Sequence, residues 1–213
     1  MPRWSLQVVP SVKTEIPRIL FRERLKRRYL GWDDAIDRRF DHHSVSLLLY
    51  EQGSADPSAV CRLIMRQWCG RTYALPMELG DLAGCKVPQP HPAACEASGL
   101  VFTSLAAAEE LALHIALWAI EHDVTQVYAL YDPSVAAPRT FYLEGAGMHT
   151  IPDAQVAYSS FRHRETQEPV WWHVAAGDPT ADGARLLSRA RARAAADEPG
   201  SPMTGLRSHL QRA

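Results

Sequence analysis

Several side chains in the first third of the sequence have the chemistry to hold a small charged molecule. Arg22 and Arg62 could each bind a carboxylate through two parallel hydrogen bonds. Asp41 could attract a cation, and Trp32 could stack on a flat ring or lie against a positive charge. Each also has a structural interpretation, with Trp32 as a core residue and Arg22 and Asp41 as an ion pair.

Cysteine and histidine do not form a metal-binding pattern. The four cysteines are Cys61, Cys69, Cys85 and Cys95. No two have the C-x-x-C spacing, whereas a structural zinc site needs four convergent ligands, usually in close pairs. Nothing suggests secretion, so we expect reduced thiols rather than disulfides. The run at 41–43, Asp-His-His, is similar to a motif of the DHH phosphoesterases, but their other acidic motifs are absent and we reject that function.

The composition is that of an ordinary globular protein. The chain has 213 residues, of which 46% are hydrophobic and 22% charged, with a net charge of -1. This balance implies no general attraction to nucleic acid or acidic lipid. An arginine stripe at Arg185, Arg189 and Arg193 is better explained as a solvated helix face than as an RNA site. Without a signal peptide or an apolar run long enough to span a bilayer, we expect a cytoplasmic protein with no membrane span.

The pattern along the chain alternates strands and helices. Gly, Pro and charged residues mark the ends of most segments. We predict strands at 5–12, 45–50, 60–65, 98–103, 126–131, 155–161 and 170–175, helices at 14–30, 105–121, 133–143 and 180–196, a loop at 31–43, and a long irregular connection at 67–95. The helix at 105–121 has the clearest apolar face, formed by Leu105, Ala108, Ala112, Ile115, Trp118 and Ala119.

This order predicts an α/β fold with a mixed sheet. A strand–helix–strand unit at 98–131 follows an antiparallel meander, which is the architecture of the GNAT acyltransferases. In that fold the two central parallel strands splay apart, and the ligand pocket opens between them. We expect a single domain over 1–196 and a mobile tail over 197–213, where apolar residues are few.

Within this fold, the sequence resembles the acyl-homoserine-lactone synthases, which make quorum-sensing signals, over roughly residues 6–160. The motifs that carry the resemblance follow one another in the family's order. They are Arg22 followed by Leu30-Gly31-Trp32, Phe40-Asp41 after an acidic and aromatic stretch, Arg62-Leu63 on a strand, Glu96-Ala97-Ser98 at the start of the central strand, and Trp118-Ala119 near the end of the long helix.

The resemblance implies a specific reaction. An acyl group would pass from an acyl-carrier protein, through its phosphopantetheine thioester, to the amine of S-adenosylmethionine, which serves as a substrate. No prosthetic group or metal is implied. Glu96 would deprotonate the amine as general base. Arg22, Trp32, Asp41, Arg62 and Ser98 would bind the substrate.

A run of basic residues fits the same picture. Arg24, Arg27 and Arg28 would dock the acidic carrier protein or its phosphopantetheine chain. The alternative is a solvated charged surface near a helix C-terminus, where cations are favoured in any case. The glycine-rich pyrophosphate loop usual before the long helix of coenzyme-A-dependent GNAT enzymes is missing, which lowers the odds of acyl-coenzyme A as donor.

Three positions depart from the family pattern. The family has an acidic residue where Arg38 stands, an arginine where Gly99 stands and an aromatic where Lys26 stands. Arg38 or Arg39 could take the place of the arginine lost at Gly99. Two other functions therefore stay open, namely a GNAT enzyme that acylates another amine from acyl-coenzyme A, and a family member that binds a ligand without catalysis.

Overall fold

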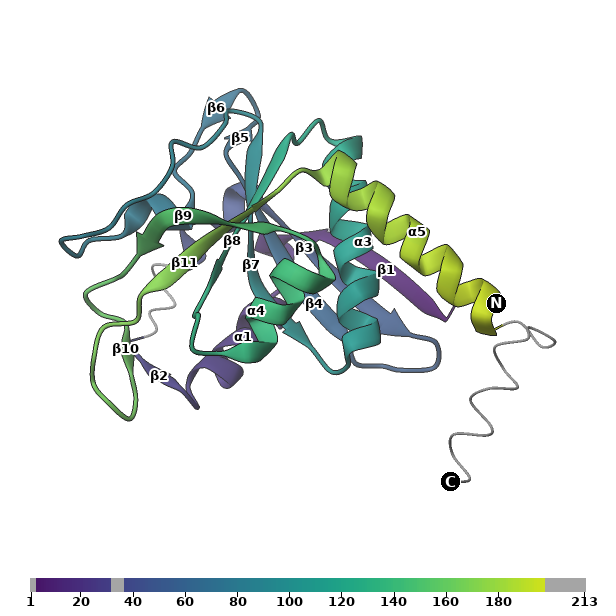
Figure 1. Cartoon of the computed structure of the whole chain (residues 1–213), viewed down its shortest axis with the longest axis horizontal. Helices are drawn as coiled ribbons and strands as arrows, with labels where there is room; N and C mark the ends of the chain where they lie inside the picture. Colours follow the sequence, from purple (N-terminus) through teal and green to yellow (C-terminus); the bar gives the residue numbers. More distant parts are fainter. Residues whose placement is uncertain (1–2, 32–36, 198–213) are drawn as a thin grey trace.

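The computed structural model describes residues 3–31 and 37–197, and nearly all of the predicted tail lies outside that range. The chain forms a seven-stranded mixed sheet in the order β1-β3-β4-β7-β8-β11-β9, with helices on both faces (Figure 1). Its strands are β1 (Trp4–Pro10), β3 (Ser44–Glu51), β4 (Ala59–Met65), β7 (Ala94–Phe102), β8 (Gln126–Tyr131), β9 (His149–Val156) and β11 (Trp172–Gly177). The α-helices are α1 (Ile16–Leu25), α3 (Leu105–Glu121), α4 (Ala136–Thr140) and α5 (Pro179–Asp197).

Four shorter strands lie outside the main sheet. They form two antiparallel pairs, β2 (Tyr29–Leu30) with β10 (Arg162–His163), and β5 (Gln67–Trp68) with β6 (Arg71–Thr72). The first pair joins the chain after α1 to the connection between β9 and β11. It therefore forms a small flap on the α1 side of the sheet.

The two central strands are parallel neighbours, as the sequence predicted. The ladder pairs Ala94 with Gln126 and continues to Ala97 paired with Ala129, while α3 connects the two strands. Every other pairing in the main sheet is antiparallel. The strand at 126–131 and the helix at 105–121 have the predicted bounds, whereas β7 begins four residues before the predicted 98–103.

A β-bulge bends β7 away from β8. Its ladder with β4 pairs Ser98 with Arg62 but Val101 with Val60, so β7 contains one extra residue there. Gly99 lies inside this bulge with φ +68°, a conformation that side chains disfavour. Beyond Ala97 the two parallel strands share no ladder pair. The bulge therefore explains why they separate at this point.

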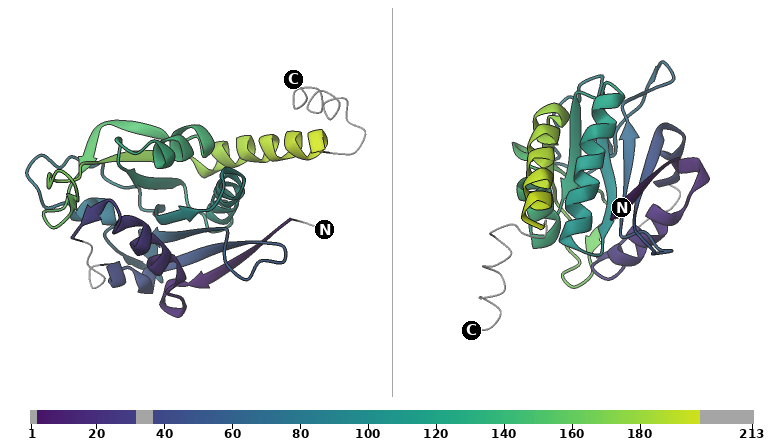
Figure 2. Two further views of the ribbon diagram at one scale, coloured as in Figure 1. Left: turned by 90° about the horizontal axis from the view of Figure 1, so that it is seen from below. Right: turned by 90° about the vertical axis from the view of Figure 1, so that its right-hand side faces the viewer.

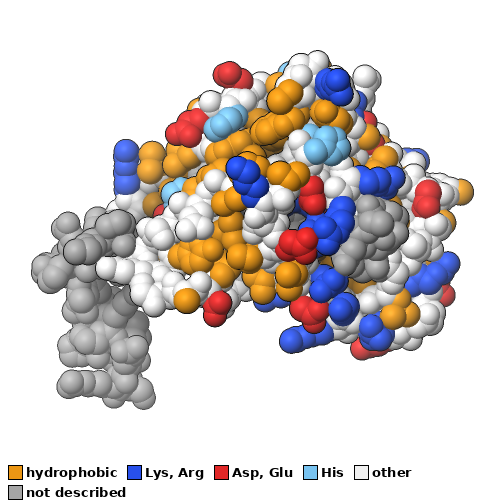
Figure 3. All heavy atoms as spheres, turned by 180° about the vertical axis from the view of Figure 1, so that it is seen from behind, with side chains coloured by type: hydrophobic (Ala, Val, Ile, Leu, Met, Phe, Trp, Pro, Cys, Tyr) orange, Lys and Arg blue, Asp and Glu red, His pale blue; other side chains and the backbone are white. Residues whose placement is uncertain are grey.

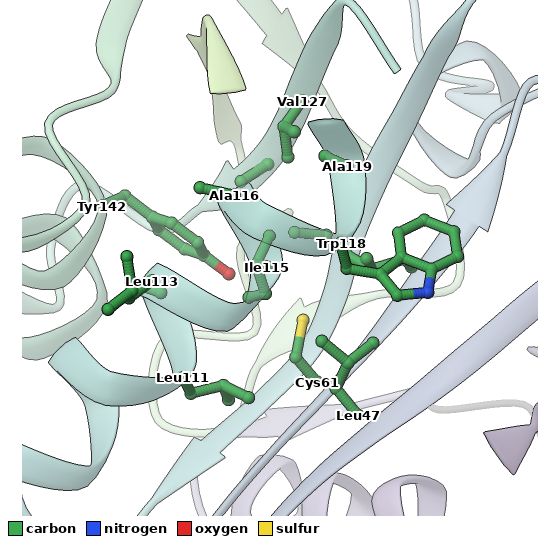
Figure 4. Packing of buried hydrophobic residues seen from close by; sticks show 14 of the residues in the cluster. Leu47, Cys61, Leu111, Leu113, Ile115, Ala116, Trp118, Ala119, Val127 and Tyr142 are labelled. Atoms are coloured by element: carbon green, nitrogen blue, oxygen red, sulfur yellow. The ribbon is translucent and has the colours of Figure 1, made fainter. Parts of the chain in front are cut away.

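The main core lies between the sheet and α3. One face of α3 places Leu111, Ile115 and Trp118 against Leu47 and Cys61 of the strands (Figure 4). Ser104 caps the helix by accepting a hydrogen bond from the Ala107 N–H at 3.2 Å. Leu105 was predicted on the buried face but is exposed, because it stands in the first turn at the open end of the helix.

Helix α1 lies on the opposite face of the sheet from α3 and α5 (Figure 2). It is shorter than the predicted helix at 14–30, because Tyr29 and Leu30 leave it to form β2. Gly31, predicted to end the helix, follows β2 instead with φ +84°, and a Cβ there would lie 1.6 Å from the Ser160 carbonyl oxygen. A glycine is therefore required for the flap to close on residue 160.

Other predicted bounds at the C-terminal end of the sheet were also wrong. The strand placed at 155–161 runs from 149 to 156, and Pro152 is tolerated because β9 is an edge strand. Phe161 instead packs with Leu25 and Tyr29 on the α1 side. The segment 133–143 contains α4 followed by a π-helical turn over 141–145 rather than one regular helix.

No helix in 3–31 or 37–197 has both the length and the hydropathy needed to span a bilayer. Within the same residues, no three His, Cys, Asp or Glu side chains lie together as metal ligands would. The four cysteines are free thiols.

Candidate active site

A cleft of about 1000 Å³ opens where β7 and β8 separate. On one side it is lined by α1 and the β2–β10 flap, and on the other by Ser134, Val135 and Tyr142, which follow β8. Tyr142 packs in the α3 core, so the cleft passes through the sheet between the two strands. An opening of this kind can hold an extended chain across the sheet with its reactive end near the strands.

Glu96 forms part of the cleft wall, one residue before the last ladder pair that joins the two strands. It pairs with Tyr128 across the ladder and is only 1% exposed. One carboxylate oxygen accepts a hydrogen bond from the Met77 N–H at 2.9 Å. Burial raises the pKa of Glu96 to about 8, against the lowering effects of this hydrogen bond and of Arg62. A carboxylate of such basicity suits proton abstraction near neutral pH.

Arg62 belongs to a chain of ion pairs that fixes the segment 37–41 to the sheet. Its guanidinium donates through both terminal nitrogens to the Asp37 carboxylate, and also to Asp41 at 3.1 Å. The other oxygen of Asp41 accepts from Arg18 at 2.8 Å. Both terminal nitrogens of Arg62 therefore already donate hydrogen bonds to carboxylates of the protein. To bind a substrate carboxylate as predicted, the Arg62 guanidinium would have to donate to that carboxylate in addition to Asp37 and Asp41.

Three basic residues in and just after α1 line the cleft. Arg24, Arg27 and Arg28 all contribute to its wall. Arg24 donates to the Phe102 carbonyl oxygen at 3.1 Å and lies 5.8 Å from the centre of the Phe102 ring. Figure 3 shows the face of the molecule that carries α1, and Lys and Arg side chains gather at its lower right with a few acidic side chains among them. This end of the cleft is therefore suited to a negatively charged group.

The structure brings some of the predicted site residues together and leaves others apart. Those that line the cleft are Arg62, Glu96, Ser98, Arg24, Arg27 and Arg28. Arg22 and Asp41 are not among the described lining residues, and the partners shown for Asp41 are Arg18 and Arg62 instead of Arg22. Trp32 lies outside the described residues.

The three departures from the family pattern have structural explanations. Arg38 does not replace the missing arginine, because it pairs with Glu15 at 2.9 Å on the surface, whereas Arg39 lines the cleft. Lys26 pairs with Glu23 at 3.1 Å. Gly99 occupies the bulge. Asp37, which precedes Arg38, pairs with Arg62 beside Asp41, and sequence reasoning did not single it out.

Sequence reasoning also missed a polar cluster at the end of β8. Asp132 is 3% exposed and accepts hydrogen bonds from the Tyr29 hydroxyl at 2.6 Å and from the Ser134 N–H at 2.8 Å. His163 of the flap lies 4.0 Å from the same carboxylate. A useful signal was available, since Asp132 directly follows a buried strand at the edge where ligands bind in open sheets.

Comparisons with known proteins support the fold and leave the family open. No protein-family model matches the chain, and no curated protein matches it. Among solved structures, FeeM, an N-acyl amino acid synthase from uncultured soil microbes, is similar with a TM-score of 0.55 and 14% identity, covering 84% of this chain and 93% of that one. The CoA-dependent acyl-homoserine lactone synthase MesI has a TM-score of 0.51 and 14% identity, covering 87% and 94%.

An enzyme with a different acceptor is similar to the same degree. The aminoglycoside N(6')acetyltransferase from Legionella pneumophila has a TM-score of 0.54 and 10% identity, covering 87% of this chain and 97% of that chain. At such identities the likeness concerns the fold and does not select an acceptor. The mixed sheet, the separated central strands and these matches together show that the chain has the GNAT acyltransferase fold.

Proposed function

We propose that this protein is an N-acyltransferase that moves an acyl group from a thioester to an amine. The observation that carries the proposal is the opening between β7 and β8 beside a buried carboxyl with a raised pKa, Glu96. A thioester threaded through this opening would present its carbonyl carbon near the bulge. An amine entering from the α1 side would meet it there.

The proposed chemistry uses groups already in the cleft. Glu96 takes a proton from the acceptor ammonium, directly or through one water. The free amine attacks the carbonyl carbon and a C–N bond forms. The C–S bond then breaks, and the sulfur leaves as a thiol with the proton that the attacking nitrogen loses. A bulge leaves one residue of β7 unpaired across the ladder, so a backbone N–H near Gly99 is suited to hold the carbonyl oxygen as charge develops on it.

For the substrates, we propose acyl transfer from an acyl-carrier protein to S-adenosylmethionine, giving an acyl-homoserine lactone. After acylation, the carboxylate would attack its own side chain and release methylthioadenosine. The motif order in the sequence supports this choice, and the structural likeness to MesI supports the lactone product but not the carrier protein as donor. A cytoplasmic location, expected from the sequence, is part of the same proposal.

Arg24, Arg27 and Arg28 are proposed to receive the phosphate of the donor. Their place in the cleft wall supports this role, because a phosphopantetheine arm carries a negative charge into the opening that its thioester must cross. Acyl-coenzyme A would bring the same arm. It is the alternative donor, and the CoA dependence of MesI favours it.

A thiol-release assay tests the proposal. The purified protein is given acyl-carrier protein or coenzyme A loaded with the same acyl group, and S-adenosylmethionine or another amine as acceptor. Release that depends on S-adenosylmethionine, with an acyl-homoserine lactone detected by mass spectrometry, supports the full proposal. Release with another amine supports only the general N-acyltransferase. No release with any pair supports a protein that binds without catalysis.

A further inference from the structure

The cluster around Asp132 places a buried carboxylate in the cleft with only neutral hydrogen-bond donors. Its partners are the Tyr29 hydroxyl and the N–H and hydroxyl of Ser134, at 2.6 to 2.8 Å. Burial alone would raise the pKa of Asp132, but the hydrogen bonds from Ser134 and Tyr29 outweigh it and hold this pKa below its usual range. The group is therefore an anion at neutral pH.

This anion lacks a close cation within the described residues. The one ion-pair partner there is His163, whose Nε2 lies 4.0 Å away, beyond hydrogen-bond distance. Buried carboxylates are otherwise paired with a cation or coordinate a metal, because an uncompensated buried charge is costly. Asp132 lines the cleft, so a positive charge supplied by a ligand would complete it.

Aromatic rings surround the same position. The ring of Tyr29 lies 5.6 Å from that of Phe161, 5.4 Å from Trp172 and 5.5 Å from His163, measured between centroids. These rings all line the cleft. A carboxylate beside several aromatic faces suits an organic cation that is weakly hydrated and cannot donate a hydrogen bond.

The cluster shares a face of the sheet with Glu96. Glu96 pairs with Tyr128 on β8, and Asp132 follows four residues later, just after the strand, where it contacts Tyr29 of the flap on the α1 side. Four residues of strand correspond to about 13 Å. An acceptor could therefore present its amine toward Glu96, through one water, while a second charged group reaches Asp132.

We propose that Asp132 and the rings of Tyr29 and Trp172 form a subsite for a permanently charged organic cation on the acceptor, of the sulfonium or quaternary ammonium class. This inference rests on the proposed function, because it assumes that the acceptor enters from the α1 side. It narrows the acceptor to molecules that carry a positive charge in addition to the reacting amine.

Binding of two nearly identical nucleosides tests the subsite without any turnover. S-adenosylmethionine and S-adenosylhomocysteine differ by one methyl group and the sulfonium charge. Calorimetric titration of the wild type should give a preference of roughly ten- to thirty-fold for the sulfonium, the size of a desolvated cation–π contact. Asp132→Asn should remove that preference, whereas Asp132→Glu, which keeps the charge, should retain part of it.

A matched control comes from the same cleft. Asp81 also lines it but holds Ser159 through hydrogen bonds at 2.5 and 2.7 Å, and Asp81→Asn should keep the preference. Thermal unfolding checks that each variant folds. Equal affinity of the wild type for the two nucleosides, or binding of neither, overturns the inference even if thiol release is observed. A clear preference in a protein that releases no thiol supports the subsite and refutes only the proposed function.

Discussion

Replacing Glu96 by glutamine tests the proposed mechanism most directly. Glutamine keeps the size of the side chain, and its amide oxygen can still accept the Met77 N–H, which now lies 2.9 Å from the carboxylate. The variant should fold and bind substrates, but it cannot take a proton. General-base catalysis contributes about a hundred- to ten-thousand-fold. We expect a loss of that size in kcat, with little change in KM.

The pH dependence of the reaction rate gives a second test of Glu96 as the general base. With a pKa of about 8 for Glu96, only about one tenth of the molecules carry the carboxylate at pH 7. The wild-type rate should therefore rise about tenfold between pH 7 and pH 9, and level off above the pKa. The variant should lack that step. Its rate should increase only as the acceptor amine itself loses its proton.

Stability should change with pH in the opposite direction. The pKa of Glu96 is raised on folding, so its protonated form favours the folded state, fully below about pH 4.5 and progressively less as pH rises through about 8. Wild-type Tm should consequently fall across this window more than that of Glu96→Gln. Thiol release and thermal scans at the same pH values measure both effects. Equal rates for the two proteins would remove Glu96 from the mechanism, and equal Tm profiles would show that its pKa is not raised.

Three further variants test other parts of the site. Gly99→Ala should lower the free energy of unfolding by about 1–2 kcal/mol, because an alanine at φ +68° is strained, and it should also reduce activity. The control Gly53→Ala, at φ +83°, should lose a similar amount of stability in thermal unfolding and keep its activity. Full activity in Gly99→Ala would show that the bulge does not shape the site. Arg62→Gln leaves the Asp37 carboxylate buried without its partner and should destabilise the fold by about 3–5 kcal/mol in urea unfolding; a change below about 1 kcal/mol would contradict the ion-pair assignment. Changing Arg24, Arg27 and Arg28 to Gln should raise KM for the acyl donor and weaken its salt dependence, whereas Arg191→Gln on α5 should not. An unchanged KM in the triple variant would place the donor elsewhere.

The elements that could be predicted are those whose burial follows a regular period. The alternation at 126–131 and the helical repeat at 105–121 have the predicted bounds, because each buries a continuous face against the other. The parallel pairing also followed from the order of elements. Long-range contacts explain the errors. Tyr29 leaves the predicted helix because its hydroxyl reaches Asp132, more than a hundred residues away along the chain.

The candidate site was predicted only in part for the same reason. Ser98 and Arg62 lie on two predicted strands that pair with each other, whereas Glu96 joins the sheet only because β7 begins at Ala94, before the predicted strand. Asp37 and Asp132 lie in connections, where no period indicates which way a side chain points. The bulge at Gly99 was equally hidden, since a glycine within a strand pattern can mark a bulge or a break.

The two faces of the sheet divide the protein into parts that selection can treat separately. The largest group of buried apolar side chains lies toward α3 and α5, whereas most of the cleft wall lies toward α1 and the flap. A substitution in α1 or the flap, away from Arg62 and its ion pairs, removes fewer of the apolar contacts that hold the fold. Descendants of such a chain can therefore acquire a new acceptor by changing α1 and the flap, while the α3 side preserves the stability that lets those changes be tolerated.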